Sequence, residues 1–365
     1  MVKSCDVGSL PFLNDVKRFL EGASRYGSST DEFVNYFERR VINGFLDKVE
    51  AGIDVPNYPQ FRDMNEMFLE MINGVERVKG GYLETGVLSI KEGKGSIPEV
   101  LAIKRNPREI YERMGGSFKM KVCVTGPYTL SSLFLYKDKG IVSRLGHMIS
   151  KIVESNLFSE KYGSVVLVSV DEPVFGLLDD PLMDRGSEAR ENLRGAWESI
   201  FQRAKPKGVQ TCMHLHNTAD VLFWDVEALN LIESHVGDPL YEAKRTRELL
   251  ESKDKFLKAS ICIADFDKLI RGRVIADSPQ KMSEFIINQR VAEAWKNIKE
   301  GKLDPKTFLE DTELMRERLS KAINRFGAER VPYAGPECGL KGFPTYECAM
   351  ECLRRVSDAI KNTTK

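Results

Sequence analysis

The sequence predicts an α/β protein that folds as one (β/α)8 barrel, the TIM-barrel fold, over residues 1–365. Two observations lead to this prediction. Short apolar runs that end in glycine or polar residues recur along the chain, as buried strands do. The longer segments between these runs space their apolar residues three and four apart, as amphipathic helices do. No repeat, low-complexity run or linker rich in proline, glycine and serine divides the chain into domains.

Eight apolar runs are the predicted strands. They lie at 5–7, 53–55, 119–124, 164–170, 208–213, 228–232, 257–263 and 330–334. The intervening segments carry helical spacing, as Phe33, Phe37 and Val41 do early in the chain. Because strands alternate with helices, the sheet is expected to be parallel, and eight such units favour a closed barrel.

Two segments depart from this rhythm. Residues 82–90 and 97–103, separated by the glycine- and lysine-rich residues 91–96, are expected to form a β-hairpin outside the barrel, an excursion over 82–103. Residues 278–326 are too long for one crossover and contain two amphipathic stretches broken at 301–305, so an added helical hairpin is expected there. This insertion has two interpretations, a packing or oligomer surface and a lid over the active site.

Composition excludes several classes of protein. With 54 basic and 54 acidic residues the net charge is zero, so neither nucleic acid nor another polyanion is an expected partner. No stretch approaches the roughly 20 apolar residues of a membrane span, and no signal peptide is recognisable, so we expect a cytoplasmic protein without a membrane partner. Seven cysteines, an odd number, favour reduced thiols or a metal site over a disulfide framework.

Reactive side chains follow several predicted strands, at the end of a barrel where active sites lie. Cys212, His214 and His216 alternate along the fifth strand, and a period of two puts all three on one face. Glu233 ends the sixth predicted strand, and Cys338 follows the eighth. Thiolate, imidazole and carboxylate from separate strands can supply the ligands of a catalytic zinc ion.

The remaining histidines and a cysteine pair give weaker signals. His147 and His235 are isolated in the sequence and are expected in the core or on the surface. Cys348 and Cys352 lie four apart on a predicted helix and are expected to pack in the core.

Four short motifs at predicted strand ends resemble the C-terminal catalytic barrel of cobalamin-independent methionine synthase. They are Val7-Gly8-Ser9-Leu10-Pro11, Val124-Thr125-Gly126-Pro127, Val170-Asp171-Glu172-Pro173 and Gly335-Pro336-Glu337-Cys338-Gly339-Leu340-Lys341. The resemblance covers nearly the whole chain, and the last motif is the most specific. The chain looks like the short archaeal relatives that consist of this barrel only. Uroporphyrinogen decarboxylases and methylcobamide:coenzyme M methyltransferases share the barrel plan and mark the alternatives.

The resemblance implies a zinc ion held by a His-x-Cys pair, a glutamate and a cysteine, with the homocysteine thiol joining the metal. Cys338 matches the single cysteine, and Glu233 matches the glutamate. For the pair, either His214 and His216 take the two places, or Cys212 and His214 do. We prefer the first arrangement because the polar turn that begins at residue 217 follows His216 directly.

The resemblance also implies an amino-acid pocket. Val7 and Ser9 match positions that hold the substrate carboxylate, and Asp171 matches the aspartate that holds the amino group. Asp63 stands where the family has a glutamate. After the seventh strand the family has a catalytic histidine, whereas this chain has Asp267, which is either the residue that handles the proton or a solvated loop aspartate.

The expected function is zinc-dependent transfer of a methyl group to the thiol of homocysteine, which gives methionine. Folate-dependent enzymes of the family use a second domain, for which 365 residues leave no room, so the expected donor is a methylated corrinoid, either methylcobalamin or a separate corrinoid protein. Two alternatives stay open. One is a methyltransferase for another thiol such as coenzyme M, and the other is a non-catalytic barrel that binds an amino acid or a corrinoid partner without metal.

Overall fold

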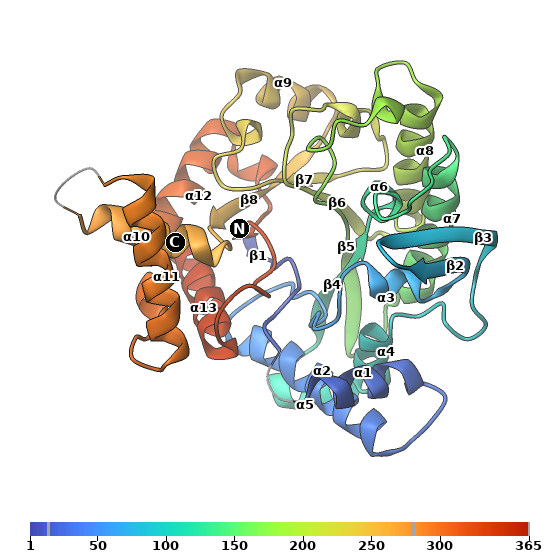
Figure 1. Cartoon of the computed structure of the whole chain (residues 1–365), viewed down its shortest axis with the longest axis horizontal. Helices are drawn as coiled ribbons and strands as arrows, with labels where there is room; N and C mark the ends of the chain where they lie inside the picture. Colours follow the sequence, from blue (N-terminus) through green and yellow to red (C-terminus); the bar gives the residue numbers. More distant parts are fainter. Residues whose placement is uncertain (13–14, 279–281, 364–365) are drawn as a thin grey trace.

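A curled sheet of seven parallel strands forms the centre of the molecule (Figure 1). The computed structural model describes residues 1–12, 15–278 and 282–363. In sheet order the strands are β1 (Lys3–Ser4), β9 (Tyr333–Pro336), β8 (Phe256–Cys262), β7 (Leu231–Glu233), β6 (Gln210–Leu215), β5 (Gly163–Glu172) and β4 (Phe118–Thr125). Six of the eight predicted strands are confirmed by β4 to β9, with ends shifted by a few residues.

The segment that was predicted as the second strand, 53–55, is not a strand. It nevertheless lies between the two edge strands, because the Val55 amide donates to the Ser4 carbonyl at 3.0 Å and the Lys121 amide donates to the Pro56 carbonyl at 2.9 Å. A proline has no N–H to donate, so Pro56 ends a regular ladder here. The first strand is also shorter and earlier than the predicted 5–7. The result is an α/β fold with a curled parallel sheet, similar to a TIM barrel.

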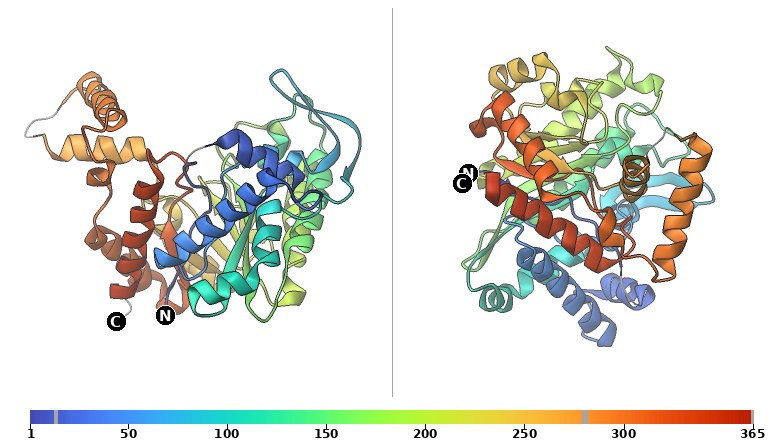
Figure 2. Two further views of the ribbon diagram at one scale, coloured as in Figure 1. Left: turned by 90° about the horizontal axis from the view of Figure 1, so that it is seen from below. Right: turned by 90° about the vertical axis from the view of Figure 1, so that its left-hand side faces the viewer.

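Helices surround the sheet on its outer side (Figure 2). The helices of the described residues are α1 (Val16–Arg25), α2 (Glu32–Glu50), α3 (Glu66–Leu69), α4 (Pro98–Arg105), α5 (Pro107–Met114), α6 (Pro127–Ser131), α7 (Ile141–Asn156), α8 (Glu188–Gln202), α9 (Lys244–Ser252), α10 (Phe266–Ala276), α11 (Glu284–Lys299), α12 (Thr312–Phe326) and α13 (Tyr346–Thr363). Short 3₁₀ turns lie at Pro181–Met183, Lys205–Lys207, Leu222–Asp225, Pro239–Tyr241, Pro305–Phe308 and Ala328–Arg330. Within the described residues, no helix is long and apolar enough to cross a membrane.

The β-hairpin uses a different partner strand from the predicted one. β3 (Gly81–Ile90) confirms the extended segment at 82–90, but it pairs antiparallel with β2 (Ile72–Val78), across a turn where Gly80 has a φ of 92°. Residues 98–103 belong instead to α4, and Ile97 caps its N-terminus, so the prediction of 97–103 as a strand is wrong. Pro98 occupies the first turn of that helix, where a missing N–H costs nothing, and Val100 and Ile103 are buried.

Residues 278–326 contain two helices, α11 and α12, on either side of the break at 301–305. Residues 279–281 of this segment lie outside the described residues. α11 packs against α10, and the two helices project from the rest of the molecule (Figure 2). α12 packs against β8 and α13, so it covers the sheet as a crossover helix does.

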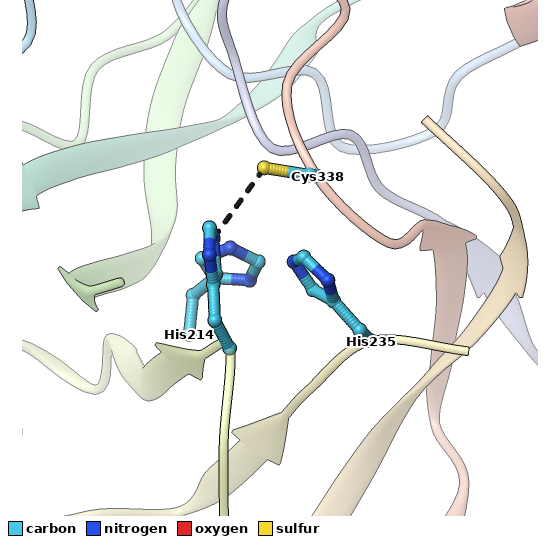
Figure 3. Close-up of side chains that lie close together, drawn as sticks. His214, His235 and Cys338 are labelled. Atoms are coloured by element: carbon cyan, nitrogen blue, oxygen red, sulfur yellow. Dashed lines mark hydrogen bonds between the residues drawn. The ribbon is translucent and has the colours of Figure 1, made fainter. Parts of the chain in front are cut away.

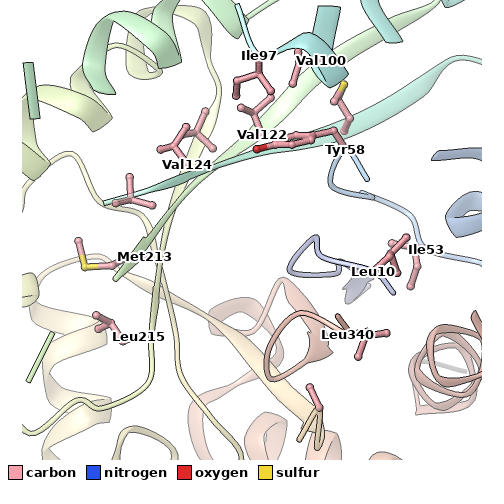
Figure 4. Close-up of a cluster of buried hydrophobic side chains, with 14 of the residues drawn as sticks. Leu10, Ile53, Tyr58, Ile97, Val100, Val122, Val124, Met213, Leu215 and Leu340 are labelled. Carbon is pink, nitrogen blue, oxygen red and sulfur yellow. The ribbon is translucent and has the colours of Figure 1, made fainter. Parts of the chain in front are cut away.

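Two groups of buried side chains stabilise the sheet. The larger group fills the space between the strands and the helices and includes Ile53, Val100, Val122 and Met213 (Figure 4). The smaller group consists of Cys5, Val55, Leu167, Cys212, Leu231 and Tyr333. Cys212 belongs to this second group. It lies two residues before His214 on β6 and is therefore further from the C-terminal end of the strand.

Candidate metal centre

Two neighbouring strands carry the polar side chains of the site in matched positions. β6 and β7 are parallel, and their register places His214 level with Glu233, two residues beyond the pair of Cys212 and Leu231. Side chains alternate along a strand, so residues two further on share the same face. His216 and His235 are those residues, and they follow the ends of the two strands.

Three histidines and one cysteine come together at this end of the sheet. Candidate ligand atoms of His214, His216, His235 and Cys338 all lie within 4.8 Å of one another. The Cys338 Sγ is 3.6 Å from Nε2 of His216, and the rings of His216 and His235 have centroids 4.1 Å apart. Figure 3 shows His214, His235 and Cys338 directed toward one another. Cys338 comes from the loop that follows β9.

The chemistry of this donor set fits a metal ion. Both ring nitrogens of His214 and the Nε2 of His235 are buried without a hydrogen-bond partner. Buried polar groups are normally paired, so facing imidazoles with free nitrogens beside a thiol fit a cation such as Zn²⁺. Cys338 is partly exposed, so the cluster lies at the rim of the sheet rather than in its deep core.

Glu233 lies beneath this cluster and is not part of it. Its Oε1 accepts a hydrogen bond from Nζ of Lys258, and both side chains are fully buried. The same Oε1 is 3.5 Å from Nδ1 of His214. Burial opposes the charge on Glu233, but the Lys258 ammonium, His214 and the Lys121 ammonium together outweigh burial and lower the pKa of the carboxyl to about 2. Glu233 is therefore a carboxylate that already has a cationic partner.

The histidines differ in their tendency to hold a proton. Burial disfavours the charge on His214, but the Glu233 carboxylate, Cys338 and Asp171 together outweigh burial and raise the pKa of His214 to about 10. Burial and the neighbouring His214 lower the pKa of His216 to about 3 and that of His235 to about 4. With these pKa values His216 and His235 are neutral at pH 7, which is the form that binds a metal ion, whereas His214 would give up a proton on binding one.

A cavity of about 80 Å³ opens beside the cluster. Its lining residues are Val7, Ser9, Gln60, Met64, Cys123, Thr125, Asp171, Pro173, His214, His216, Cys338 and Gly339. The structure therefore brings three of the residues matched to the amino-acid pocket, Val7, Ser9 and Asp171, to the same cavity as three residues of the histidine and cysteine cluster.

Asp171 is the acidic side chain among these lining residues. It is 4% exposed, and its two oxygens accept hydrogen bonds from Sγ of Cys123 at 2.9 Å and from Oγ of Ser169 at 2.8 Å. Burial and the adjacent Asp171 raise the pKa of the Cys123 thiol well above its usual range, so Cys123 remains a neutral donor. The carboxylate is thereby fixed in orientation at the wall of the cavity.

Two other predicted site residues do not line this cavity. Asp63 is exposed and accepts hydrogen bonds from the amides of Asn65 and Glu66, both at 2.9 Å, at the start of α3. Asp267 is exposed in the first turn of α10 and accepts a hydrogen bond from Nε1 of Trp295 at 2.5 Å. Asp63 thus stabilises the start of α3, and Asp267 joins α10 to α11. Met64 rather than Asp63 lines the cavity.

Two buried glutamates from the sequence motifs hold the loops of the site. Glu337 accepts hydrogen bonds from the amides of Val236 at 2.8 Å and Ala264 at 3.1 Å, and so joins the segments that follow β7, β8 and β9. Glu172 accepts hydrogen bonds from the amides of Tyr128 and Thr129 and from Nε1 of Trp197 at 2.7 to 3.0 Å. Burial raises the pKa of Glu172 to about 7.

His235 is the residue that the sequence analysis missed. It was expected in the core or on the surface, but it belongs to the cluster. The available signal was the spacing of Glu233 and His235, which repeats the spacing of His214 and His216 on the preceding strand. Of the two ligand arrangements left open by the sequence, the structure places His216 beside Cys338 and Cys212 in a deeper buried group.

Two solved structures match the chain over almost its whole length. One is a B12-independent methionine synthase from a Shewanella species in complex with selenomethionine, with a TM-score of 0.60, 14% identity, and coverage of 100% of this chain and 99% of that one. The other is a Listeria monocytogenes protein assigned as a vitamin-B12-independent methionine synthase, with a TM-score of 0.58, 13% identity, and coverage of 99% and 98%. No protein-family model and no curated protein sequence matches the chain. The chain therefore has the TIM-barrel-like fold of B12-independent methionine synthase structures.

Proposed function

We propose that the chain is a zinc-dependent methyltransferase that transfers a methyl group to the thiol of homocysteine and so forms methionine. The observation that supports this proposal is a single cavity whose lining combines candidate metal ligands with residues suited to bind an amino acid. His214, His216 and Cys338 form a wall suited to a metal ion, and Ser9 and Asp171 form a wall suited to an amino acid. The shared fold with two structures named as methionine synthases supports the same reaction class.

A free thiol has a pKa of about 8.5 and is mostly protonated at neutral pH. Zinc bound at the cluster would lower that pKa and supply the acceptor sulfur as a thiolate. Asp171 would hold the substrate ammonium, and Ser9 and the backbone of Val7 would hold its carboxylate. These contacts would fix the sulfur against the metal wall, so alignment with the donor would supply much of the remaining rate enhancement.

The charge of the cavity favours an amino acid over coenzyme M. Among the described lining residues of this cavity there is no lysine or arginine, and Asp171 is a buried acidic group. A thiol with a sulfonate and no ammonium would bring its negative charge toward this carboxylate without a cationic side chain to offset it. Homocysteine carries an ammonium that can pair with Asp171.

The proposed donor is a methylated corrinoid, presented as methylcobalamin or by a separate corrinoid protein. This part of the proposal depends on the sequence resemblance to single-barrel relatives. Both matched structures carry names that describe them as independent of vitamin B12, so the donor must be tested against a folate.

The test is an assay of methionine formation by the purified chain. Homocysteine is supplied with zinc and with either methylcobalamin or methyltetrahydrofolate, and coenzyme M replaces homocysteine in parallel reactions. We expect methionine from homocysteine and methylcobalamin, its loss on treatment with a chelator, and its return with zinc. Methionine from the folate donor alone would overturn the corrinoid proposal, and a product from coenzyme M alone would overturn the proposed acceptor.

A further inference from the structure

We propose that His235, and not Glu233, is the fourth protein ligand of the metal, together with His214, His216 and Cys338, and that Glu233 is a positioning residue beneath His214. The inference deepens the proposed function, since it takes zinc as the metal of that site. It departs from the ligand set that the sequence resemblance implies, in which Glu233 itself binds the metal.

Glu233 is already committed to another cation. Its Oε1 accepts a hydrogen bond from Lys258, which also donates to the Pro336 carbonyl at 3.3 Å. The side chains of Lys258 and Glu233 are 1% and 0% exposed. The other oxygen of Glu233, Oε2, is buried without a hydrogen-bond partner but is not among the clustered ligand atoms, so Glu233 would have to move to bind the metal. A movement away from Lys258 would leave that ammonium buried without a counter-charge, which is a costly arrangement in a protein interior.

His235 is free to bind and correctly placed. A ligand nitrogen of His235 lies within 4.8 Å of the ligand atoms of His214, His216 and Cys338, whereas Glu233 is absent from that group. The Nε2 of His235 is buried without a partner. The segment that carries this ring is fixed, because Glu337 accepts a hydrogen bond from the amide of the next residue, Val236, at 2.8 Å.

The paired positions on β6 and β7 give Glu233 its role. His214 and Glu233 form the deeper pair, with Nδ1 of His214 at 3.5 Å from the Glu233 carboxylate. A closer approach of roughly half an ångström would make this contact a hydrogen bond. His214 would then donate from Nδ1 and bind the metal through Nε2, and an outer carboxylate of this kind fixes the orientation of a ligating imidazole. His216 and His235 form the upper pair, which faces the loop of Cys338.

This ligand set changes the charge of the centre. Three neutral imidazoles and one thiolate carry one negative charge, whereas two imidazoles, a carboxylate and a thiolate carry two. A Zn²⁺ centre with the first set is therefore one unit more positive, which favours the deprotonation of a thiol that reaches it.

Three single variants and the wild type test the inference. Zinc affinity is measured by competition with a chromophoric chelator, and the number of imidazole ligands is measured by X-ray absorption at the zinc edge. We expect three imidazoles and one sulfur in the wild type. His235→Ala should lose one imidazole and weaken zinc binding by at least about 100-fold, whereas Glu233→Gln should keep three imidazoles and weaken binding by about 10- to 100-fold. His147→Ala removes the exposed histidine of α7 and should change neither quantity.

The outcomes separate this inference from the proposed function. An unchanged imidazole count and affinity in His235→Ala, or a wild type that binds no zinc, would overturn the inference. Wild-type protein with three imidazoles that forms no methionine would overturn the proposed function alone. If Glu233→Gln fails to fold because Lys258 is left unpaired, the double variant Glu233→Gln with Lys258→Met removes both charges, and it should keep three imidazoles.

Discussion

The buried ion pair of Lys48 and Asp6 holds the irregular segment between β1 and β4 that contains Asn57. Removal of this ion pair is therefore expected to be strongly destabilising. Lys48 lies on α2 with its side chain fully buried. Its Nζ donates to Oδ2 of Asp6 at 2.7 Å and to the carbonyls of Gly8 and Asn57 at 2.8 and 3.1 Å. The other oxygen of Asp6 accepts a hydrogen bond from the Asn57 amide at 2.7 Å. These contacts replace the strand ladder that is missing after residue 55.

The perturbation is Lys48→Met, which keeps an unbranched side chain and removes the charge. It leaves the Asp6 carboxylate buried without its cation and deprives two carbonyls of a donor. Breaking a buried pair in this way typically costs about 3–5 kcal/mol, and we expect a loss of this size in the free energy of unfolding. The double variant Asp6→Asn with Lys48→Met removes both charges and should recover much of the loss.

Urea unfolding followed by circular dichroism measures the change, provided that the slope of the transition is the same in each variant. Arg108→Met is the matched control, because Arg108 forms an ion pair with Glu112 on the exposed face of α5 and should not change the transition measurably. A loss below about 1 kcal/mol for Lys48→Met would refute the reasoning that this pair fixes the segment.

Three further predictions concern the site and its edge. Cys338→Ser should remove most of the zinc and leave the circular dichroism spectrum unchanged, and full zinc occupancy would contradict its role as a ligand. Asp171→Asn should weaken homocysteine binding by about 1.5–3 kcal/mol but leave binding of 3-mercaptopropionate, which lacks the amine, nearly unaffected; equal losses would contradict an ammonium contact. Gly335→Ala should lower the melting temperature, because its Cβ would lie 1.9 Å from the Cys5 carbonyl oxygen, and an unchanged melting temperature would show that β1 moves aside freely.

The parallel strands could be predicted because each contains buried apolar residues in close succession. β4 to β8 are buried along most of their length, as strands covered on both faces are, and their patterns stand out from the amphipathic helices. The segment after α2 has the same apolar character at 53–55, but Pro56 and the contacts of Asp6 and Lys48 decide its conformation. Those contacts join residues about 40 to 50 positions apart and leave no local pattern.

Residues 97–103 show a different limit of local patterns. Their apolar residues fit a short strand as well as one turn of a buried helix, and periodicity alone does not separate the two for so short a run. Pro98 was the better guide, since proline is favoured in the first turn of a helix and disfavoured inside a paired strand. The true partner of β3 is β2, in which all residues but Ile72 are exposed or half-buried, so that it lacks the apolar run by which the other strands were recognised.

The sequence predicted the ligand residues that lie together on one strand. It did not predict the residue that is recognised only when neighbouring strands are compared. His214 and His216 were recognised because both lie on one strand two residues apart. His235 became visible only in the register of β6 with β7, in which His214 is level with Glu233 and each strand continues two residues further to a histidine. A parallel sheet makes such pairs systematic, because residues of equal height on adjacent strands share a face. A candidate ligand at the end of one strand is therefore a reason to inspect the same offset on the next strand. In this chain that comparison leads from Glu233, which is paired with Lys258 and lies outside the group of clustered ligand atoms, to His235, which lies within that group.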